Sequence, residues 1–137
     1  MQNKQAGDLY EQEFCLRCLK NNLYPFMPTG DFLPLDLVVV NGAGRCFRVQ
    51  VKGTGVKDRE TRAAASTAYR YKFCLPKVAT YATAFDVLVC YMAPEDLFYC
   101  IPSAEVDGIS TLSLRPHIEG ESRWAPYKNN WSIFKTV

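Results

Sequence analysis

Two apolar runs on either side of a turn, one of them interrupted by a carboxylate, constrain the fold more than any other feature. Leu35 to Val40 is rich in β-branched residues and contains Asp36. Asn41-Gly42-Ala43-Gly44 is turn chemistry, and a second run from Cys46 to Val51 follows it. Such runs joined by a short Asn-Gly turn are typical of a β-hairpin. The sequence therefore predicts two antiparallel strands with a charged group, costly to bury, near the start of the first.

The second strand of this hairpin has one polar face. Side chains alternate between the two faces of a strand, so Arg48, Gln50 and Lys52 share one face and two valines share the other. If the hairpin pairs across its turn, Asp36 lies at the same end as Gln50 and Lys52. One face then carries a carboxylate, an amide oxygen and an ammonium.

The rest of the chain predicts an α/β fold with a mixed sheet. Residues 5–21 form an amphipathic pattern with Tyr10, Phe14 and Cys18 on one face, which indicates a helix. The expected order is helix, strand, strand, strand, helix, strand, followed by additions. The remaining elements that the patterns indicate are a loop at 53–66 with a helical turn near 63–65, strands at 69–75, 85–92, 97–101 and 110–114, and helices at 76–84 and 127–134.

Length and charge place limits on the class of protein. The chain has 137 residues, the usual size of one domain, so residues 1–137 are expected to form a single domain, with a core at about 5–105 and additions at 106–137. The net charge of +2 excludes a histone-like polycation but not a nucleic-acid partner. No apolar run is long enough to span a bilayer, and no secretory signal begins the sequence, so a cytoplasmic protein is expected.

Several other chemistries lack support in the sequence. Cys15 and Cys18 form a C-x-x-C inside the predicted helix, but no second pair exists and the lone His117 is distant, which disfavours a zinc site. The remaining four cysteines lie in apolar runs, where free cysteine behaves as a small hydrophobe. No glycine-rich phosphate loop occurs, so no nucleotide cofactor is expected.

The polar face of the hairpin suits metal-assisted hydrolysis of a phosphodiester. Asp and amide oxygens are ligands for Mg²⁺, which takes few protein groups and keeps several waters. A lysine beside the metal stabilises developing negative charge. Basic residues that lie where DNA would need them are Arg45, Arg48, Lys57, Arg59, Arg62, Arg70 and Lys72.

These residues carry a resemblance to a known superfamily. Pro34-Leu35-Asp36 followed by Gln50-Val51-Lys52 resembles the signature of the PD-(D/E)XK nucleases. The Q-x-K form is similar to the branch that contains intron-associated, or homing, endonucleases. Gly7-Asp8-Leu9-Tyr10-Glu11 resembles the helix of that branch that carries a glutamate. The resemblance covers about residues 5–105 and implies the restriction-endonuclease-like core, αβββαβ, with a mixed central sheet flanked by helices.

The resemblance also implies a role for each site residue. Asp36 becomes the central metal ligand, and Gln50 takes the second position through its carbonyl oxygen. Glu11 contributes from the helix, the backbone carbonyl of Val51 faces the metal, and Lys52 is the catalytic lysine. Mg²⁺ is the implied cofactor, which Mn²⁺ can replace. The implied catalytic set is Glu11, Asp36, Gln50 and Lys52, and the implied metal ligands are Glu11, Asp36, Gln50 and Val51.

Helical spacing favours Glu11 over Glu13 as the glutamate of the site. Glu13 has Arg17 four residues later, which is typical of a solvated face with salt bridges. Glu11 instead has Phe14 three residues later and Cys18 seven residues later, so it is expected to point towards the packed side.

The predicted function is a Mg²⁺-dependent endodeoxyribonuclease of the homing or restriction-like type. A junction-resolvase-like nuclease stays open as an alternative, because it shares this core. The neutral Gln50 keeps a second class open, a DNA-binding module without catalysis, and a structural or protein-interaction domain is the third. The expected partner is double-stranded DNA. One active site in each chain and two strands to cut predict a homodimer or a higher symmetric oligomer.

Overall fold

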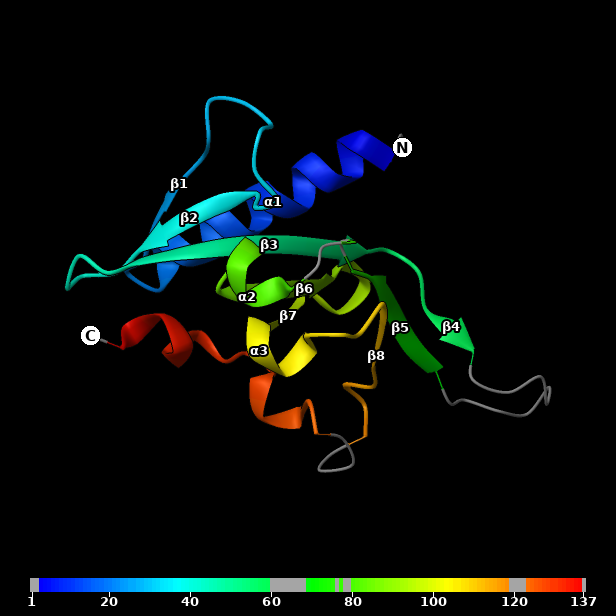
Figure 1. The fold of residues 1–137 in the computed structure, drawn as a ribbon. Helices are drawn as coiled ribbons and strands as arrows, with labels where there is room; N and C mark the ends of the chain where they lie inside the picture. The colour runs from blue at the N-terminus through cyan, green and yellow to red at the C-terminus, as the bar shows by residue number, and fades with distance from the viewer. Residues whose placement is uncertain (1–2, 60–68, 76, 78–79, 119–122, 137) are drawn as a thin grey trace.

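The computed structural model of the chain describes residues 3–59, 69–75, 77, 80–118 and 123–136. In this part of the chain, one long helix and several short ones surround two β-sheets (Figure 1). The helices, with 3₁₀ turns labelled η, are α1 (Asn3–Lys20), α2 (Tyr81–Ala84), η1 (Ala93–Glu95), α3 (Ser103–Val106), η2 (Ala125–Tyr127) and η3 (Trp131–Lys135). The strands are β1 (Tyr24–Phe26), β2 (Leu37–Val40), β3 (Cys46–Thr54), β4 (Asp58–Arg59), β5 (Tyr69–Cys74), β6 (Val87–Met92), β7 (Leu97–Pro102) and β8 (Thr111–Leu114).

The larger sheet has five strands in the order β1-β2-β3-β6-β7. Strands β3 and β6 run parallel, whereas the other neighbouring pairs of this sheet are antiparallel. The segment between β3 and β6, which contains α2, supplies the crossover that a parallel pair requires. This is the mixed α/β arrangement that the sequence predicts, and the predicted hairpin is β2 with β3.

The identity of the third core strand differs from the prediction. The strand expected at 69–75 is present as β5, but it lies in a smaller antiparallel sheet of order β4-β5-β8. In the larger sheet, the place expected for this strand is taken by β1, which pairs antiparallel with β2. Strand β1 has only three residues, with Pro25 at its centre, so it offers no period-two pattern to detect. Proline is tolerated there because β1 is an edge strand.

The bounds of two strands also differ from the prediction, and both differences lie at the candidate site. Strand β2 begins at Leu37, so Asp36 lies just before the strand and not inside it. Strand β3 continues past Val51 into the predicted loop, because Gly53 and Thr54 pair with Tyr91 and Met92 of β6.

The smaller elements match the prediction in part. Strand β8 occupies the strand expected at 110–114. Helix α2 covers only the end of the helix expected at 76–84, of which residues 76, 78 and 79 lie outside the described residues, as does the helical turn expected near 63–65. The C-terminal helix expected at 127–134 is replaced by the short 3₁₀ turns η2 and η3.

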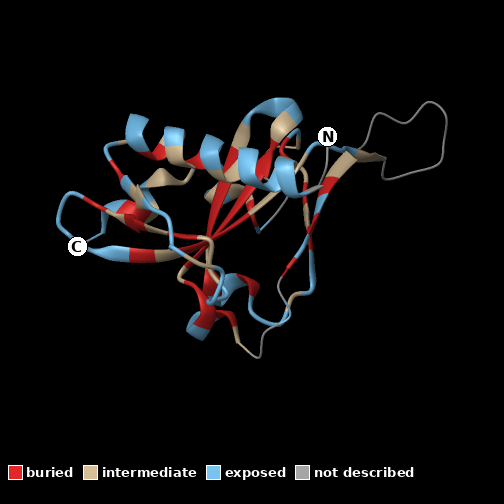
Figure 2. Cartoon of the chain, turned by 90° about the horizontal axis from the view of Figure 1, so that it is seen from above, coloured by how far each residue is buried: buried red, intermediate tan, exposed pale blue. Residues whose placement is uncertain are grey.

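Both faces of the larger sheet are covered, so β6, which lies between β3 and β7, is buried throughout (Figure 2). On one face, Phe14 and Cys18 of α1 and Phe134 of η3 form a core with Val87, Val89 and Tyr91 of β6. On the other face, the intervening residues of β6 pack with β5, β8 and α2. A strand buried on both faces reads as a continuous apolar run, which explains why residues 85–92 were recognisable from the sequence.

Two further findings concern the chain as a whole. No helix among the described residues combines the length and the apolar character needed to cross a membrane. All six cysteines are free thiols.

Candidate active site

Asp36 is fixed by the strand that it faces. Its backbone N–H donates to the carbonyl of Val49 at 2.9 Å, which continues the hairpin by one residue beyond β2. Its Oδ2 accepts hydrogen bonds from the backbone N–H of Val51 at 2.7 Å and from Nε2 of Gln50 at 2.8 Å. The half-buried carboxylate therefore has one oxygen held by β3.

Glu11 approaches the same point from α1. Burial and, next to it, the neighbouring carboxylate of Asp36 raise the pKa of Glu11 to about 7, with smaller effects from Asp8 and Asp31. Glu13, two residues further along the helix, is exposed. The structure thus places Glu11, and not Glu13, beside Asp36, as the helical spacing predicts.

The pKa of Asp36 is shifted by its burial and by the groups around it. Burial raises its pKa. The backbone N–H of Val51 and the charge of Lys52 oppose this rise. The hydrogen bond with Glu11 also lowers the pKa of Asp36, whereas Asp36 raises the pKa of Glu11. The two carboxyls therefore hold less than two full negative charges near neutral pH. A cation bound between them would remove this penalty.

Gln50 and Lys52 lie on one face of β3, as the period of two predicts. Gln50 is 9% exposed, and its amide nitrogen is the group that donates to Asp36. Its carbonyl oxygen is left for another partner. Lys52 is half-buried, and its ammonium is near enough to lower the pKa of Asp36.

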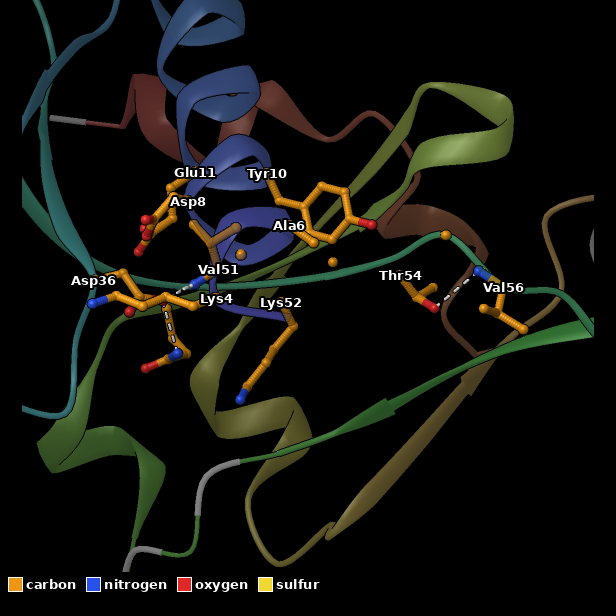
Figure 3. Close-up of a pocket in the computed structure, with 14 residues that line it drawn as sticks. Lys4, Ala6, Asp8, Tyr10, Glu11, Asp36, Val51, Lys52, Thr54 and Val56 are labelled. Carbon is orange, nitrogen blue, oxygen red and sulfur yellow. Dashed lines mark hydrogen bonds between the residues drawn. The ribbon is translucent and has the colours of Figure 1, made fainter. Parts of the chain in front are cut away.

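These groups open into a single cavity of about 820 Å³ (Figure 3). Its walls carry Glu11, Asp36, Gln50 and Lys52. Sequence reasoning missed another cation on its wall, Lys4 from the first turn of α1. No sequence signal separates Lys4 from an ordinary surface lysine, because its place depends on how the helix packs on the sheet.

Tyr10 and Gly53 join α1 to β3 inside this cavity. The ring of Tyr10 lies so close to Gly53 that a Cβ at this glycine would overlap ring atoms. The Tyr10 hydroxyl reaches Gly55, where an added Cβ would lie 3.3 Å from it. The ring also packs edge-on against Tyr91, with centroids 5.7 Å apart. Tyr10 therefore packs α1, the helix that carries Glu11, against Gly53-Thr54-Gly55.

The residues present fit a hard divalent cation. In the described part of the chain, no three His, Cys, Asp or Glu side chains are grouped to hold a metal by themselves. The donors beside β3 are the carboxylates of Glu11 and Asp36, the Gln50 amide oxygen and the backbone carbonyl of Val51, and Asp8 of α1 also lines the cavity (Figure 3). All are oxygens, which Mg²⁺ prefers, and Mg²⁺ completes its shell with water. Cys15 lies apart from this set, with its Sγ 4.0 Å from Sδ of Met27.

Arg48, one of the seven predicted DNA-contacting residues, is held by several polar contacts. Its guanidinium pairs with Asp86 at 3.0 Å and donates to the carbonyls of Thr83 at 2.8 Å and Ala82 at 3.0 Å. The backbone N–H of Arg48 also donates to Asp86, at 2.8 Å. Arg48 therefore ties β3 to the end of α2 and the start of β6, which leaves it little freedom to reach a phosphate.

The other predicted contacts are spread over both ends of β3 and the smaller sheet. Arg45 lies over Phe47 at 4.7 Å and donates to Thr136. Lys57 lies over the ring of Tyr69 at 4.5 Å, and Lys72 pairs with Asp58 at 3.8 Å. Among the residues not yet placed, Arg70 is half-buried in β5, Arg59 belongs to β4, and Arg62 lies outside the described residues.

His117 is exposed and stacks on Tyr69 with ring centroids 3.9 Å apart. Tyr69, the first residue of β5, is thus contacted by both Lys57 and His117.

Comparison with known proteins identifies the class to which this fold and site belong. A family model described as PD-(D/E)XK endonuclease matches residues 1–134, so the chain belongs to the PD-(D/E)XK endonuclease family and is a nuclease. Among solved structures, it is similar to the bacterial homing endonuclease I-Ssp6803I, with a TM-score of 0.75 and 25% sequence identity over 98% of this chain and 92% of that one. No curated protein sequence matches it significantly. The predicted family and the restriction-endonuclease-like fold are confirmed.

Proposed function

We propose that this nuclease is a Mg²⁺-dependent endodeoxyribonuclease that cuts double-stranded DNA, and that Mn²⁺ can replace Mg²⁺. One observation carries the proposal. Glu11 from α1, Asp36 from the start of β2, and Gln50 and Lys52 from β3 line the same cavity. Two acids, an amide oxygen and an ammonium make up a donor set suited to a hard cation and a phosphodiester.

In this proposal, four groups hold the cation. They are the carboxylates of Glu11 and Asp36, the amide oxygen of Gln50 and the backbone carbonyl of Val51. When bound, Mg²⁺ supplies polarisation of a phosphoryl oxygen and a lower pKa for a coordinated water. The hydrogen bonds from the Val51 N–H and the Gln50 amide fix one oxygen of Asp36 on β3, which holds the carboxylate in place beside Glu11.

The chain's own residues then position the reactants. Lys52 directs its ammonium into the cavity, where it orients the attacking water and stabilises the negative charge that develops on the phosphoryl oxygens. The water attacks in line with the departing 3′ oxygen, the P–O3′ bond breaks, and the products carry a 5′-phosphate and a 3′-hydroxyl. The packing of Tyr10 on Gly53 fixes α1 against β3, and thereby fixes the position of Glu11 in the cavity.

A homing or restriction-like role is proposed over other nuclease roles. Its support is the Q-x-K pattern and the similarity to a structure described as a bacterial homing endonuclease. A junction-resolvase-like enzyme is the alternative, and cleavage of a four-way junction compared with a linear duplex separates the two. Gln50 favours a second candidate, a DNA-binding module without catalysis, because a neutral ligand weakens the hold on a cation.

The proposal extends to the protein's partners and surroundings. Residues 1–137 act as one nuclease domain in a homodimer or a higher symmetric oligomer, because each chain supplies one catalytic centre and a duplex has two strands. The enzyme works in the cytoplasm, where DNA and Mg²⁺ are both present.

The test is cleavage of supercoiled plasmid and of a four-way junction with Mg²⁺, with Mn²⁺ or with EDTA. Asp36→Ala and Lys52→Ala should each remove metal-dependent cleavage. Lys20→Ala is the matched control, because Lys20 is exposed at the far end of α1. DNA binding that falls steeply with salt, with no cleavage of a randomised target library in any metal, would support the binding module instead.

A further inference from the structure

Lys4 is a cation on the cavity wall that no acid of the described residues neutralises. It is exposed in the first turn of α1, and none of the ion pairs in this part of the chain includes it. Asp8 follows four residues later, but a lysine that precedes its acid is the weaker order for a helical pair. Lys4 and Lys52 point in different directions at the cavity (Figure 3). The two ammonium groups are therefore placed for different partners.

The helix itself gains nothing from a lysine at this position. The aligned peptide dipoles give the N-terminal end of a helix a partial positive charge, which favours acids and disfavours cations. The first turn of α1 contains no acid. An anion from outside the chain would be attracted to this end by the dipole and by the ammonium of Lys4 together.

Gly7, three residues after Lys4, leaves the same wall of the cavity open. A glycine inside a helix is less favourable than an alanine, because it loses more conformational freedom on folding. Neither the packing nor the backbone requires glycine here. An added Cβ would meet nothing within 4 Å, and Gly7 has no positive φ. The missing side chain therefore leaves room for a molecule that enters the cavity.

We propose that Lys4 binds a phosphate of the DNA strand that is cut, next to the scissile phosphate, and that Gly7 lets this strand approach α1. The inference rests on the proposed function, which places the scissile phosphate at Asp36 and Lys52. Lys4 and Glu11 are seven residues apart, about 10 Å along the helix axis. The two side chains therefore face successive parts of a strand in the cavity, and Lys4 is a substrate-binding residue that fixes the strand while the other groups act on the scissile bond.

The first test is DNA binding without metal, measured by fluorescence anisotropy with a labelled random-sequence duplex in EDTA at several salt concentrations. Lys4→Gln should bind about fivefold more weakly at about 50 mM salt, and the slope of log affinity against log salt should fall by about 0.9, because one phosphate contact is lost. Lys4→Arg keeps the charge and should keep the wild-type slope. Lys20→Gln is the matched control, because it removes the same charge from the far, exposed end of α1 and should change neither quantity.

A second variant separates loss of the contact from a defect in folding. Glutamine is a better helix former than glycine, so Gly7→Gln should be at least as stable as the wild type in urea unfolding. Its side chain fills the open wall, so it should weaken DNA binding about fivefold or more. A stable Gly7→Gln variant with wild-type affinity would mean that the strand does not pass this wall.

The variant Lys4→Gln/Lys52→Gln tests whether the two lysines contact different phosphates. The losses in salt slope should then add, to about 1.8. A double variant with the slope of Lys4→Gln alone would mean one shared phosphate and would overturn the assignment to a neighbouring one. In nicking of supercoiled plasmid with Mg²⁺, Lys4→Gln should raise KM about fivefold and keep kcat within about twofold, because the contact is the same in the ground state and the transition state.

The outcomes distinguish this inference from the proposed function. Wild-type affinity, salt slope and KM in Lys4→Gln would overturn the inference, and so would a fall in kcat with KM unchanged, which would place Lys4 in the chemistry. The binding measurements contain no metal and need no cleavage. A protein that binds DNA through Lys4 and cuts none would therefore count against the proposed function alone.

Discussion

The carboxyl groups of Glu11 and Asp36, 25 positions apart in the sequence, meet in one cavity, where Asp36 raises the pKa of Glu11 and their hydrogen bond lowers the pKa of Asp36. Helix α1 brings the first, and the residue just before β2 brings the second. Both acids are partly removed from water, and the Val51 N–H, the hydrogen bond with Glu11 and the charge of Lys52 favour the ionised form of Asp36, to which the Gln50 amide also donates. The metal-free site is therefore under electrostatic strain that protons or a cation relieve.

The stability of the metal-free protein should fall as the pH rises from about 5 to 7. The pKa of Glu11 rises from an ordinary 4.5 to about 7 on folding, so the folded chain holds this proton more tightly than the unfolded chain. The stabilisation is complete below pH 4.5 and is lost as the pH passes 7. Glu11 is partly exposed, so solvent screening reduces the expected loss to about 1 kcal/mol.

Urea unfolding in EDTA at several pH values measures this loss. Glu11→Gln should flatten the slope between pH 5 and 7, whereas Glu13→Gln, on the exposed side of the helix, should leave it unchanged. Parallel pH profiles for wild type and Glu11→Gln would show that Glu11 does not titrate in this range. Mg²⁺ should bind more tightly with rising pH through 7, because the cation and the proton compete for Glu11.

Gln50→Glu should strengthen metal binding and weaken the metal-free fold. The new carboxylate would be the third acid at the site, and it would lose the hydrogen bond that the Gln50 amide donates to Asp36 at 2.8 Å. Without metal, we expect a loss of about 1–3 kcal/mol at pH 8, the cost of an unmatched buried acceptor. With metal, the extra charge should tighten Mg²⁺ binding about tenfold.

Calorimetric titration with Mg²⁺ and urea unfolding with and without the ion give both numbers. A variant with wild-type metal affinity would place the amide oxygen outside the ligand set. Gln12→Glu is the control, because it adds the same charge to an exposed position on α1.

How far the sequence predicts this site depends on the kind of contact. The hairpin and its alternating face were predictable because period two leaves a clear pattern at Arg48, Gln50 and Lys52. Glu11 was predictable from helical spacing once a glutamate was sought. Strand β1 was not, because three residues around Pro25 carry no period. The position of Lys4 in the cavity and the hydrogen bonds from Arg48 to α2 could not be predicted from local sequence patterns. Both depend on the packing of elements that are distant in the sequence.

Arg48 and Lys57 should behave differently in DNA binding, although both are basic residues near the site. Arg48 is held by Asp86 and by two carbonyls at the end of α2. Arg48→Ala should therefore lower the free energy of unfolding by about 1–2 kcal/mol. It should leave the salt dependence of DNA affinity nearly unchanged. Lys57→Ala removes the contact with the Tyr69 ring, so it should lower stability by at most about 1 kcal/mol and reduce the slope of log affinity against log salt by about one. Urea unfolding and fluorescence anisotropy at several salt concentrations measure the two effects, and a lowered salt slope in Arg48→Ala would assign that residue to the DNA surface.

The contact between Tyr10 and Gly53 should be required for the position of Glu11. A methyl group at Gly53 overlaps the ring of Tyr10, so Gly53→Ala must push α1 away from β3. We expect a loss of about 1–3 kcal/mol in stability, typical of overpacking, together with weaker Mg²⁺ binding. Tyr10→Ala/Gly53→Ala relieves the overlap, so adding Gly53→Ala to Tyr10→Ala should cost much less than adding it to the wild type. Urea unfolding of the four proteins in this double-mutant cycle gives the coupling. Gly42→Ala is the control: Gly42 lies on the open turn of the hairpin with nothing within 4 Å of an added Cβ, so this substitution should be nearly neutral. Additive losses in the cycle would mean that the ring of Tyr10 and Gly53 do not contact each other.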